Sequence, residues 1–168
     1  MYSNKGKLMF NYNVENRNSS VHGEGLYTLE NIKKGSIVFY WGMDEGDKPI
    51  SEEEYLEKRK DKSDEPYQKT AARWVHNRFM HCTEWGLDCY INHSFNSNIL
   101  YYCGIGFAKK DIKKDEELSI NFQYIYSDKD PAAFKDTETK EEVIGLNNEK
   151  CLNNSAKELV YLIKNLYK

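Results

Sequence analysis

The sequence lacks any apolar run that is long enough to cross a membrane or to direct export. No stretch approaches about 18 consecutive apolar residues, and the segment Met1–Asn13 contains no apolar signal core. The cysteines show neither a CxxC pair nor the spacing of a disulfide framework; they are Cys82, Cys89, Cys103 and Cys151. We therefore expect reduced thiols and a soluble, intracellular protein of the cytoplasm or the nucleus.

A strong charge of one sign is also missing. The net charge is −3 at pH 7, and no long basic stripe occurs. Direct binding of duplex nucleic acid is therefore not expected. A mildly acidic protein suits a basic peptide partner, but a charge of this size is too small to establish one by itself.

The composition that is present is that of one globular domain. A length of 168 residues leaves room for a hydrophobic core, and we expect a single domain over 1–168. Apolar residues make up 39% and charged residues 30%, which is typical of a folded chain. Tyrosine supplies most of the 14% of aromatic residues. Aromatic walls around a site would explain this excess, and so would an AT-rich genome, so both explanations stay open.

Two segments with the same order of residue types predict β-structure. IKKG at 32–35 precedes a β-prone stretch at 36–40, and IKKD at 112–115 precedes another at 116–120. Gly35 and Asp115 supply residues that tolerate a tight turn. Shorter strands are predicted just upstream, at 25–29 and 105–109. The pattern favours two hairpin-like units in one β-rich domain.

A helical insert is predicted between these two units. Ser51 and Glu54 form a capping box that begins a charged surface helix, which extends to Lys62 and is limited by Pro66. A second helix is predicted over about 68–79. Its apolar positions recur at helical spacing: Ala71, Ala72, Val75 and Phe79.

The tail contains the clearest helical pattern. Ser155 and Glu158 form another capping box. The apolar face that follows consists of Leu159, Leu162, Ile163 and Leu166. This helix either closes the core or forms a lid over a ligand site.

Four short motifs carry the chemistry. They are GEGLY at 23–27, FYWG at 39–42, YINHSFNSN at 90–98, and EELSINFQY at 116–124, which is introduced by FAKKDI at 107–112. Two glycines one residue apart let the backbone approach a ligand closely. The third glycine and the helix of a dinucleotide fingerprint are missing.

Taken in order, these motifs resemble the SET domain family over roughly residues 20–126. Members of that family are mostly protein-lysine methyltransferases that use S-adenosylmethionine and release S-adenosylhomocysteine. The resemblance implies an α+β fold that is mainly β, with an α insert at about 43–85. Small curled sheets of the SET-type β-clip would surround a knot-like crossing of the third and fourth motifs. Residues 127–168 would form a C-terminal extension with a helix.

The resemblance also implies roles for individual residues. Those expected to bind the cofactor are Gly23, Glu24, Gly25, Tyr27, Asn92, His93 and Tyr126. Those expected to line the channel for the substrate lysine are Tyr40, Ile120, Phe122 and Tyr124. A desolvated aromatic channel beside a sulfonium cation would lower the pKa of the lysine, so that its neutral amine can attack. Positioning is the main requirement of such a reaction.

One departure from the family pattern concerns the catalytic tyrosine. Phe122 stands where the family usually has a tyrosine, four residues after Leu118. Tyr124 lies two residues further on, and a shift of two keeps the same face of a strand. Tyr124 and Tyr40 are therefore the predicted catalytic residues. Substitution of the hydroxyl by Tyr40 or Tyr126 alone, or an inactive site, remains open.

A second departure concerns zinc. Phe95 stands where many relatives have a cysteine, and the tail offers Cys151 alone, so no zinc is expected. The nearby His81, Cys82, Cys89 and His93 fit no standard zinc spacing and favour buried thiols and polar histidines. The helix at Ser155 is then the candidate lid of the cofactor pocket. Tyr126 and Phe134 are the candidate aromatics that stack on adenine.

Three hypotheses follow from these residues. The first is an active methyltransferase that acts on a lysine-containing protein or peptide, with histones among the candidate substrates. The second is a catalytically silent SET-like module that binds the cofactor or a lysine-containing peptide. The third is an interaction domain in which the motifs are purely structural.

Overall fold

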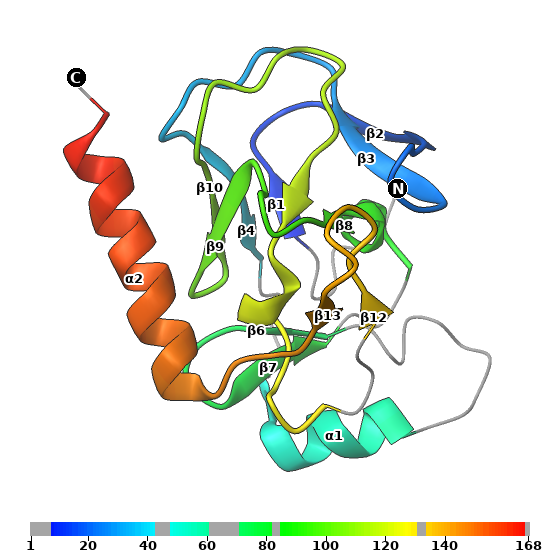
Figure 1. Ribbon diagram of the computed structural model, residues 1–168, viewed down its shortest axis with the longest axis vertical. Coiled ribbons are helices and arrows are strands. Elements are labelled where there is room, and N and C mark those ends of the chain that lie inside the picture. Colours follow the sequence, from blue (N-terminus) through cyan, green and yellow to red (C-terminus); the bar gives the residue numbers. More distant parts are fainter. Residues whose placement is uncertain (1–7, 43–47, 61–70, 82–84, 131–133, 167–168) are drawn as a thin grey trace.

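The computed structural model describes residues 8–42, 48–60, 71–81, 85–130 and 134–166. Its largest sheet has six strands in the order β1-β4-β10-β9-β11-β8 (Figure 1). The strands are β1 (Leu8–Phe10), β4 (Ile37–Trp41), β8 (Asn92–His93), β9 (Ile99–Tyr102), β10 (Ile105–Ala108) and β11 (Ser119–Ile120). Strand β11 pairs in parallel with both β8 and β9, so that the third and fourth motifs meet in this sheet.

Smaller sheets and helices surround the six-stranded sheet. The sheets are β2 (Val14–Asn18) with β3 (Glu24–Thr28), then β5 (Ile50–Ser51), β7 (Arg78–His81) and β6 (Ala71–Arg73), and finally β12 (Phe134–Lys135) with β13 (Glu142–Val143). The helices are α1 (Glu52–Lys60), α2 (Asn148–Lys164) and the 3-10 turns η2 (Leu87–Tyr90) and η3 (Phe122–Tyr124). The α+β fold predicted from the sequence, mainly β with small curled sheets and a C-terminal helix, is confirmed.

The two turns that the sequence predicts lie side by side. Gly35 and Asp115 adopt left-handed backbone angles, with φ of 83° and 66°, a region that suits glycine and tolerates aspartate. Ile32 and Ile112 form an antiparallel bridge between the two loops, and both side chains are buried. The loops run together at the top of Figure 1. The two hairpin-like units therefore pair with each other, although the predicted strand at 116–120 is limited to Ser119–Ile120.

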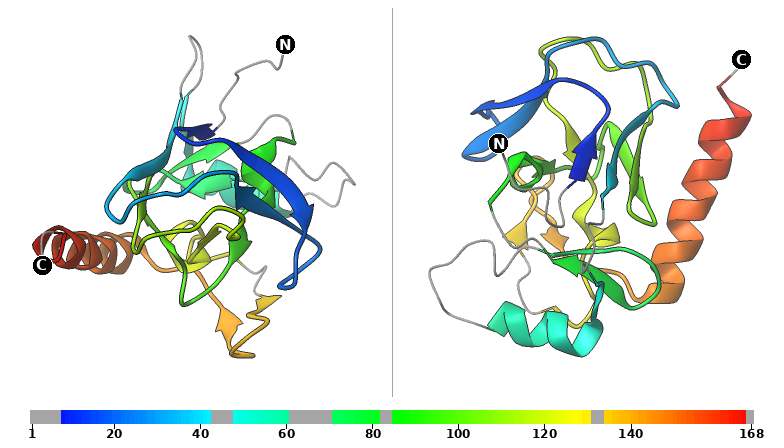
Figure 2. Two further views of the ribbon diagram at one scale, coloured as in Figure 1. Left: turned by 90° about the horizontal axis from the view of Figure 1, so that it is seen from above. Right: turned by 180° about the vertical axis from the view of Figure 1, so that it is seen from behind.

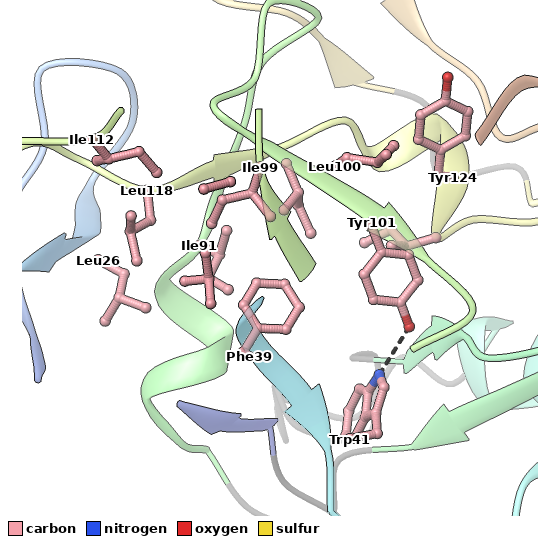
Figure 3. Packing of buried hydrophobic residues seen from close by; sticks show 14 of the residues in the cluster. Leu26, Phe39, Trp41, Ile91, Ile99, Leu100, Tyr101, Ile112, Leu118 and Tyr124 are labelled. Carbon is pink, nitrogen blue, oxygen red and sulfur yellow. Dashed lines mark hydrogen bonds between the residues drawn. The ribbon is translucent and has the colours of Figure 1, made fainter. Parts of the chain in front are cut away.

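The core is built from strands of the six-stranded sheet and from β3, and includes Leu26, Phe39 and Ile99, which are fully buried (Figure 3). Trp41 donates from its indole nitrogen to the Tyr101 hydroxyl over 2.9 Å. That hydroxyl in turn donates to a main-chain carbonyl of β6 over 2.6 Å. These bonds satisfy two buried polar groups and fasten the insert to the main sheet.

The insert differs from the prediction in its second half. Helix α1 begins as expected, because the Ser51 hydroxyl accepts a bond from the Glu54 amide over 3.2 Å. The helix predicted over about 68–79 is wrong: β6 and β7 form an antiparallel hairpin there, and residues 61–70, including Pro66, lie outside the described residues. His76 takes a left-handed φ of 51° in the turn. Phe79 stacks on Tyr55 of α1 with ring centroids 4.0 Å apart, so tertiary packing overrides a short helical pattern.

Helix α2 begins earlier than predicted. The Asn147 side chain caps it by accepting a bond from the Lys150 amide over 2.9 Å. Ser155 lies inside the helix, where its hydroxyl donates to the Cys151 carbonyl over 2.7 Å, so the capping box predicted at Ser155 is wrong. The helix runs along the outside of the molecule and contacts β9 and η3 (Figure 2). Among the described residues, neither α1 nor α2 is both long and apolar enough to span a bilayer.

Candidate functional site

Asn92 joins the third motif to the glycine-rich turn. It lies on β8, and its side-chain nitrogen Nδ2 donates to the main-chain oxygens of His22 and Glu24 over 3.2 and 3.1 Å. Gly23 stands between those two oxygens with a φ of 51°, and a Cβ atom there would meet open space. The structure therefore brings Gly23, Glu24 and Asn92 together, three of the residues that the sequence assigns to the cofactor site.

Glu117 completes this group, although no role is predicted for it from the sequence. Its carboxylate accepts bonds from the Ser19 hydroxyl over 2.8 and 2.9 Å, from the Tyr27 hydroxyl over 3.0 Å, and from Asn92 Nδ2 over 2.8 Å. A Cβ atom on Gly25 would lie 2.2 Å from the carboxylate oxygen Oε1. Gly25 thus makes room for Glu117. Burial and this carboxylate raise the pKa of Tyr27, which keeps the phenol a donor.

His93 lies beside Asn92 and is buried, with 5% of its surface exposed. Its Nδ1 accepts a bond from the Phe122 amide over 3.0 Å. Its Nε2 lies 3.6 Å from Asp136 Oδ1, which is too long for a hydrogen bond, and it is buried without a partner among the described residues. Burial lowers the pKa of His93, while the Asp136 carboxylate acts in the opposite direction. The imidazole is therefore neutral near pH 7.

Aromatic rings enclose the His93 imidazole. The ring centroids of Phe95, Phe122 and Phe134 lie 4.7, 5.4 and 5.6 Å from it. Tyr126 packs edge-on against Phe122 at 5.4 Å. Phe134 belongs to β12, so the β12–β13 hairpin covers His93. The sequence predicted α2 as this lid, but α2 lies against β9 and η3 instead.

Tyr124 faces away from this aromatic cluster. Phe122 and Tyr124 belong to the 3-10 turn η3, whereas the sequence predicted a strand. Because successive residues of a 3-10 helix are about 120° apart, two residues separated by one do not share a face. The same-face argument for Tyr124 is therefore wrong. Tyr124 is 7% exposed, and its hydroxyl donates to Glu158 of α2 (Figure 3 shows this hydroxyl pointing away from the other labelled core residues). Burial and Glu158 both raise its pKa.

The remaining predicted channel residues occupy different positions. Ile120 is buried on β11 and pairs with His93 in the sheet, so it lies near Phe122. Tyr40 is 42% exposed on β4, where it pairs with Met9 and Ile105. Within the described part of the chain, no hydrogen bond or ring contact joins Tyr40 to His93 or Phe122.

The described residues also hold no group of three His, Cys, Asp or Glu side chains that is suited to a metal ion. Of the four zinc-type residues noted in the sequence, Cys82 lies outside the described residues. His93 is surrounded by phenyl rings rather than by thiolates. Burial raises the pKa of the Cys151 thiol to about 11, so this cysteine is a neutral packing group.

Solved structures share this fold. One is titled "ctPRC2 in an autoinhibited conformation bound to S-adenosylmethionine"; it matches 88% of this chain and 22% of its own, with 20% identity and a TM-score of 0.52. Another is the Chaetomium thermophilum polycomb repressive complex 2, with 21% identity over 82% of this chain and 20% of its own, and a TM-score of 0.50. A third, an active polycomb repressive complex 2 in the stimulated state, has 23% identity and a TM-score of 0.53 over 83% of this chain and 18% of its own. At these identities the likeness concerns the fold.

Sequence comparison gives the family. A curated protein of Plasmodium falciparum (isolate 3D7), named "Putative histone-lysine N-methyltransferase 1", is 31% identical over 127 residues. The alignment, gaps included, covers 64% of this chain but only 2% of that relative. The family model of the SET domain matches residues 23–123, which include the glycine-rich turn, Asn92, His93 and Phe122. The chain belongs to the SET domain family.

Proposed function

We propose that this chain is a protein-lysine methyltransferase that transfers a methyl group from S-adenosylmethionine to a lysine side chain of a protein. The observation that carries the proposal is the joining of Asn92 to the Gly23–Gly25 turn, with His93 beside it under an aromatic cluster. Family membership supplies the reaction class.

The residues present fit the cofactor. Open space beside Gly23 leaves its backbone accessible to the amino-acid end of a ligand. Phe134 is 39% exposed next to His93, so it offers an aromatic face to an adenine. Gly23, Glu24, Asn92 and His93 would therefore hold the cofactor, with Tyr27 supporting Glu117 and Tyr126 supporting Phe122. When bound, the cofactor supplies an electrophilic methyl group on a sulfonium.

The rest of the chemistry belongs to the substrate lysine and the walls around it. A lysine must lose its proton before its nitrogen can attack, and its usual pKa is about 10.4. Ile120 and Phe122 provide a dry apolar wall that disfavours the charged form. Exposed Tyr40 would stand at the entrance, where a tyrosine face stabilises a methylammonium product.

The proposal depends on which residue supplies the hydroxyl that orients the lysine nitrogen. Tyr124 can supply it if its hydroxyl exchanges the bond to Glu158 for a bond to the substrate. The second candidate function, a silent module that binds the cofactor or a peptide, is favoured by that same bond and by the missing hydroxyl on Phe122. The two functions share the cofactor residues and differ at η3.

The experiment measures transfer of labelled methyl from S-adenosylmethionine to histones and to a cell lysate. We choose histones first because the Plasmodium relative's name specifies histone lysine; such a substrate implies a nuclear location. If the proposal is right, the unaltered chain labels lysine and Tyr124→Phe abolishes the labelling. Tyr161→Phe, on an exposed face of α2, leaves the labelling unchanged. If Tyr124→Phe labels lysine at the unaltered rate, the orienting hydroxyl comes from Tyr40 or Tyr126 instead.

The silent module gives a different set of results. The unaltered chain then binds S-adenosylhomocysteine in calorimetry but labels nothing, and Phe122→Tyr, which places a hydroxyl at the family position, gains labelling. Failure of both S-adenosylmethionine and S-adenosylhomocysteine to bind at millimolar concentration would overturn both functions and leave an interaction domain.

A further inference from the structure

Asn92 has a fixed orientation in this structure. Its Nδ2 is surrounded by three acceptors: the main-chain oxygens of His22 and Glu24, and Glu117 Oε1. An amide nitrogen has two hydrogens and an amide oxygen has none, so these neighbours determine which end of the amide faces them. The oxygen Oδ1 must therefore point the other way. No donor among the described residues contacts it, so it is free to accept a bond from a ligand.

Glu117 is the only one of these three acceptors that is a side chain, and it is charged. Its carboxylate is held by the hydroxyls of Ser19 and Tyr27 as well as by Asn92, and all of these donors are neutral. In the part of the chain that the structure describes, no cation pairs with Glu117. The turn thus contains a half-buried negative charge that a bound cation would compensate.

The absence of a side chain at position 25 makes room for the Glu117 carboxylate where it stands. Any side chain at position 25 would overlap Oε1, because a Cβ atom there lies 2.2 Å away. Tyr27 and Glu117 also form an antiparallel bridge, so β3 positions the backbone of Glu117 while Ser19, Tyr27 and Asn92 donate to its carboxylate. Such a built-in arrangement fits a positioning role better than a chance surface contact.

From this arrangement we infer that Glu117 is a positioning and specificity residue. It orients the Asn92 amide so that Oδ1 faces outward, and it supplies the negative charge that selects the α-ammonium group of the cofactor's amino-acid end. The inference rests on the proposed function, since it presumes that the cofactor binds here. Its distinctive consequence is that Glu117 recognises one functional group of the ligand and not the ligand as a whole.

The experiment compares two ligands by calorimetry: S-adenosylhomocysteine and its desamino analogue, which lacks only the α-amino group. Glu117→Ala is expected to weaken S-adenosylhomocysteine binding on the order of 10- to 100-fold, the usual effect of losing a hydrogen bond to a charged group. Binding of the desamino analogue should change less than about threefold, because sites that share no partner act independently. Glu116→Ala is the matched control, since that neighbouring carboxylate pairs with Lys110 instead.

Three further variants separate positioning from mere support of the fold. Asn92→Ala should weaken binding of S-adenosylhomocysteine as Glu117→Ala does, and the double variant should bind no more weakly than either, because both remove one recognition unit. Glu117→Gln keeps an oxygen for Asn92, so it should recover most of the affinity while losing part of the preference for the amino group.

The outcomes distinguish this inference from the proposed function. If the unaltered chain binds neither ligand, both fall. Suppose instead that the unaltered chain binds S-adenosylhomocysteine. The proposed function then stands, and the role of Glu117 is overturned if Glu117→Gln and Glu117→Ala weaken binding of both ligands equally. It is also overturned if their effects on binding add to that of Asn92→Ala. Melting temperatures measured without ligand identify any variant that fails to fold. If Glu117→Ala is one of them, the comparison of the two ligands with Glu117→Gln tests the role of Glu117.

Discussion

Removing the hydroxyl of Tyr124 tests how the C-terminal helix is fastened to the domain. That hydroxyl donates to Glu158 of α2, which also pairs with Lys109 over 3.0 Å. Tyr124 is 7% exposed, whereas the Glu158 side chain is 35% exposed. A hydrogen bond to a charged group contributes about 1.5–3 kcal/mol. Because Glu158 keeps Lys109 and gains water, Tyr124→Phe should lower the free energy of unfolding by the smaller part of that range, about 1.5–2 kcal/mol.

The assay is urea denaturation followed by circular dichroism. The midpoint should fall while the slope m stays constant, since the surface exposed on unfolding is unchanged. Glu158→Gln completes a double-mutant cycle with Tyr124→Phe, and the coupling between the two should exceed about 0.5 kcal/mol because they are in contact. Tyr161→Phe is the matched control. Tyr161 is 72% exposed on the same helix, so removing its hydroxyl should not shift the midpoint.

Strict additivity in that cycle, or a midpoint unchanged in Tyr124→Phe, would contradict an anchoring role for the Tyr124 hydroxyl. Either result means that the hydroxyl does not anchor α2 in solution and is free for a substrate. Methyl transfer by the same variant, measured well below its melting temperature, then reports the catalytic role separately from the structural one.

Further predictions concern buried groups elsewhere. Gly25→Ala places a Cβ atom against the fixed Glu117 carboxylate and should lower the unfolding free energy in urea by about 1–3 kcal/mol. Tyr55→Phe removes the buried hydroxyl that donates to Asp130 over 2.5 Å and should cost about 1–3 kcal/mol in the same assay. Burial lowers the pKa of His93 below 6.5, so the unfolded chain takes up its proton first and stability falls as pH drops below about 6.5 toward the folded pKa. His93→Gln should show a flatter urea midpoint between about pH 7 and 5; an equally steep profile would exclude His93 as the source.

The parts of the fold that the sequence predicts are those fixed by local chemistry. Gly35 and Asp115 adopt the left-handed turns for which their residue types are suited. Ser51 caps α1 as the capping box requires. In each case a few neighbouring residues determine the backbone, so no knowledge of distant contacts is needed.

The errors arise where distant contacts decide. Apolar residues over 71–79 fit a helix, but the turn at His76 and the stacking of Phe79 on Tyr55 make a hairpin. Helix α2 begins at an asparagine cap without a glutamate three residues later, so the capping box at Ser155 is the stronger signal in the sequence. A capping box inside a helix carries no information about where that helix begins.

The site shows the same division. The family motifs identify Asn92 and His93, because a short ordered pattern carries them. Glu117 and Asp136 reach these two residues from 25 and 43 positions further along the chain, by subtraction of the residue numbers, and the contacts exist only after folding. No periodicity in the sequence predicts such partners. Gly25 is an indirect sign of one, because a side chain at that position would meet Glu117.

Asn121 contributes to the orientation of Tyr124. The strand argument for Tyr124 assumes extended backbone after Ile120, where side chains alternate with period two. Asn121 ends that alternation: its side chain accepts a bond from the Gln123 amide over 3.0 Å and begins η3. Asparagine is a preferred cap, so this signal was present in the sequence. Once η3 forms, Phe122 turns toward His93 and Tyr124 toward α2. Whether a tyrosine hydroxyl can reach the site therefore depends on the Asn121 cap as well as on the missing hydroxyl of Phe122.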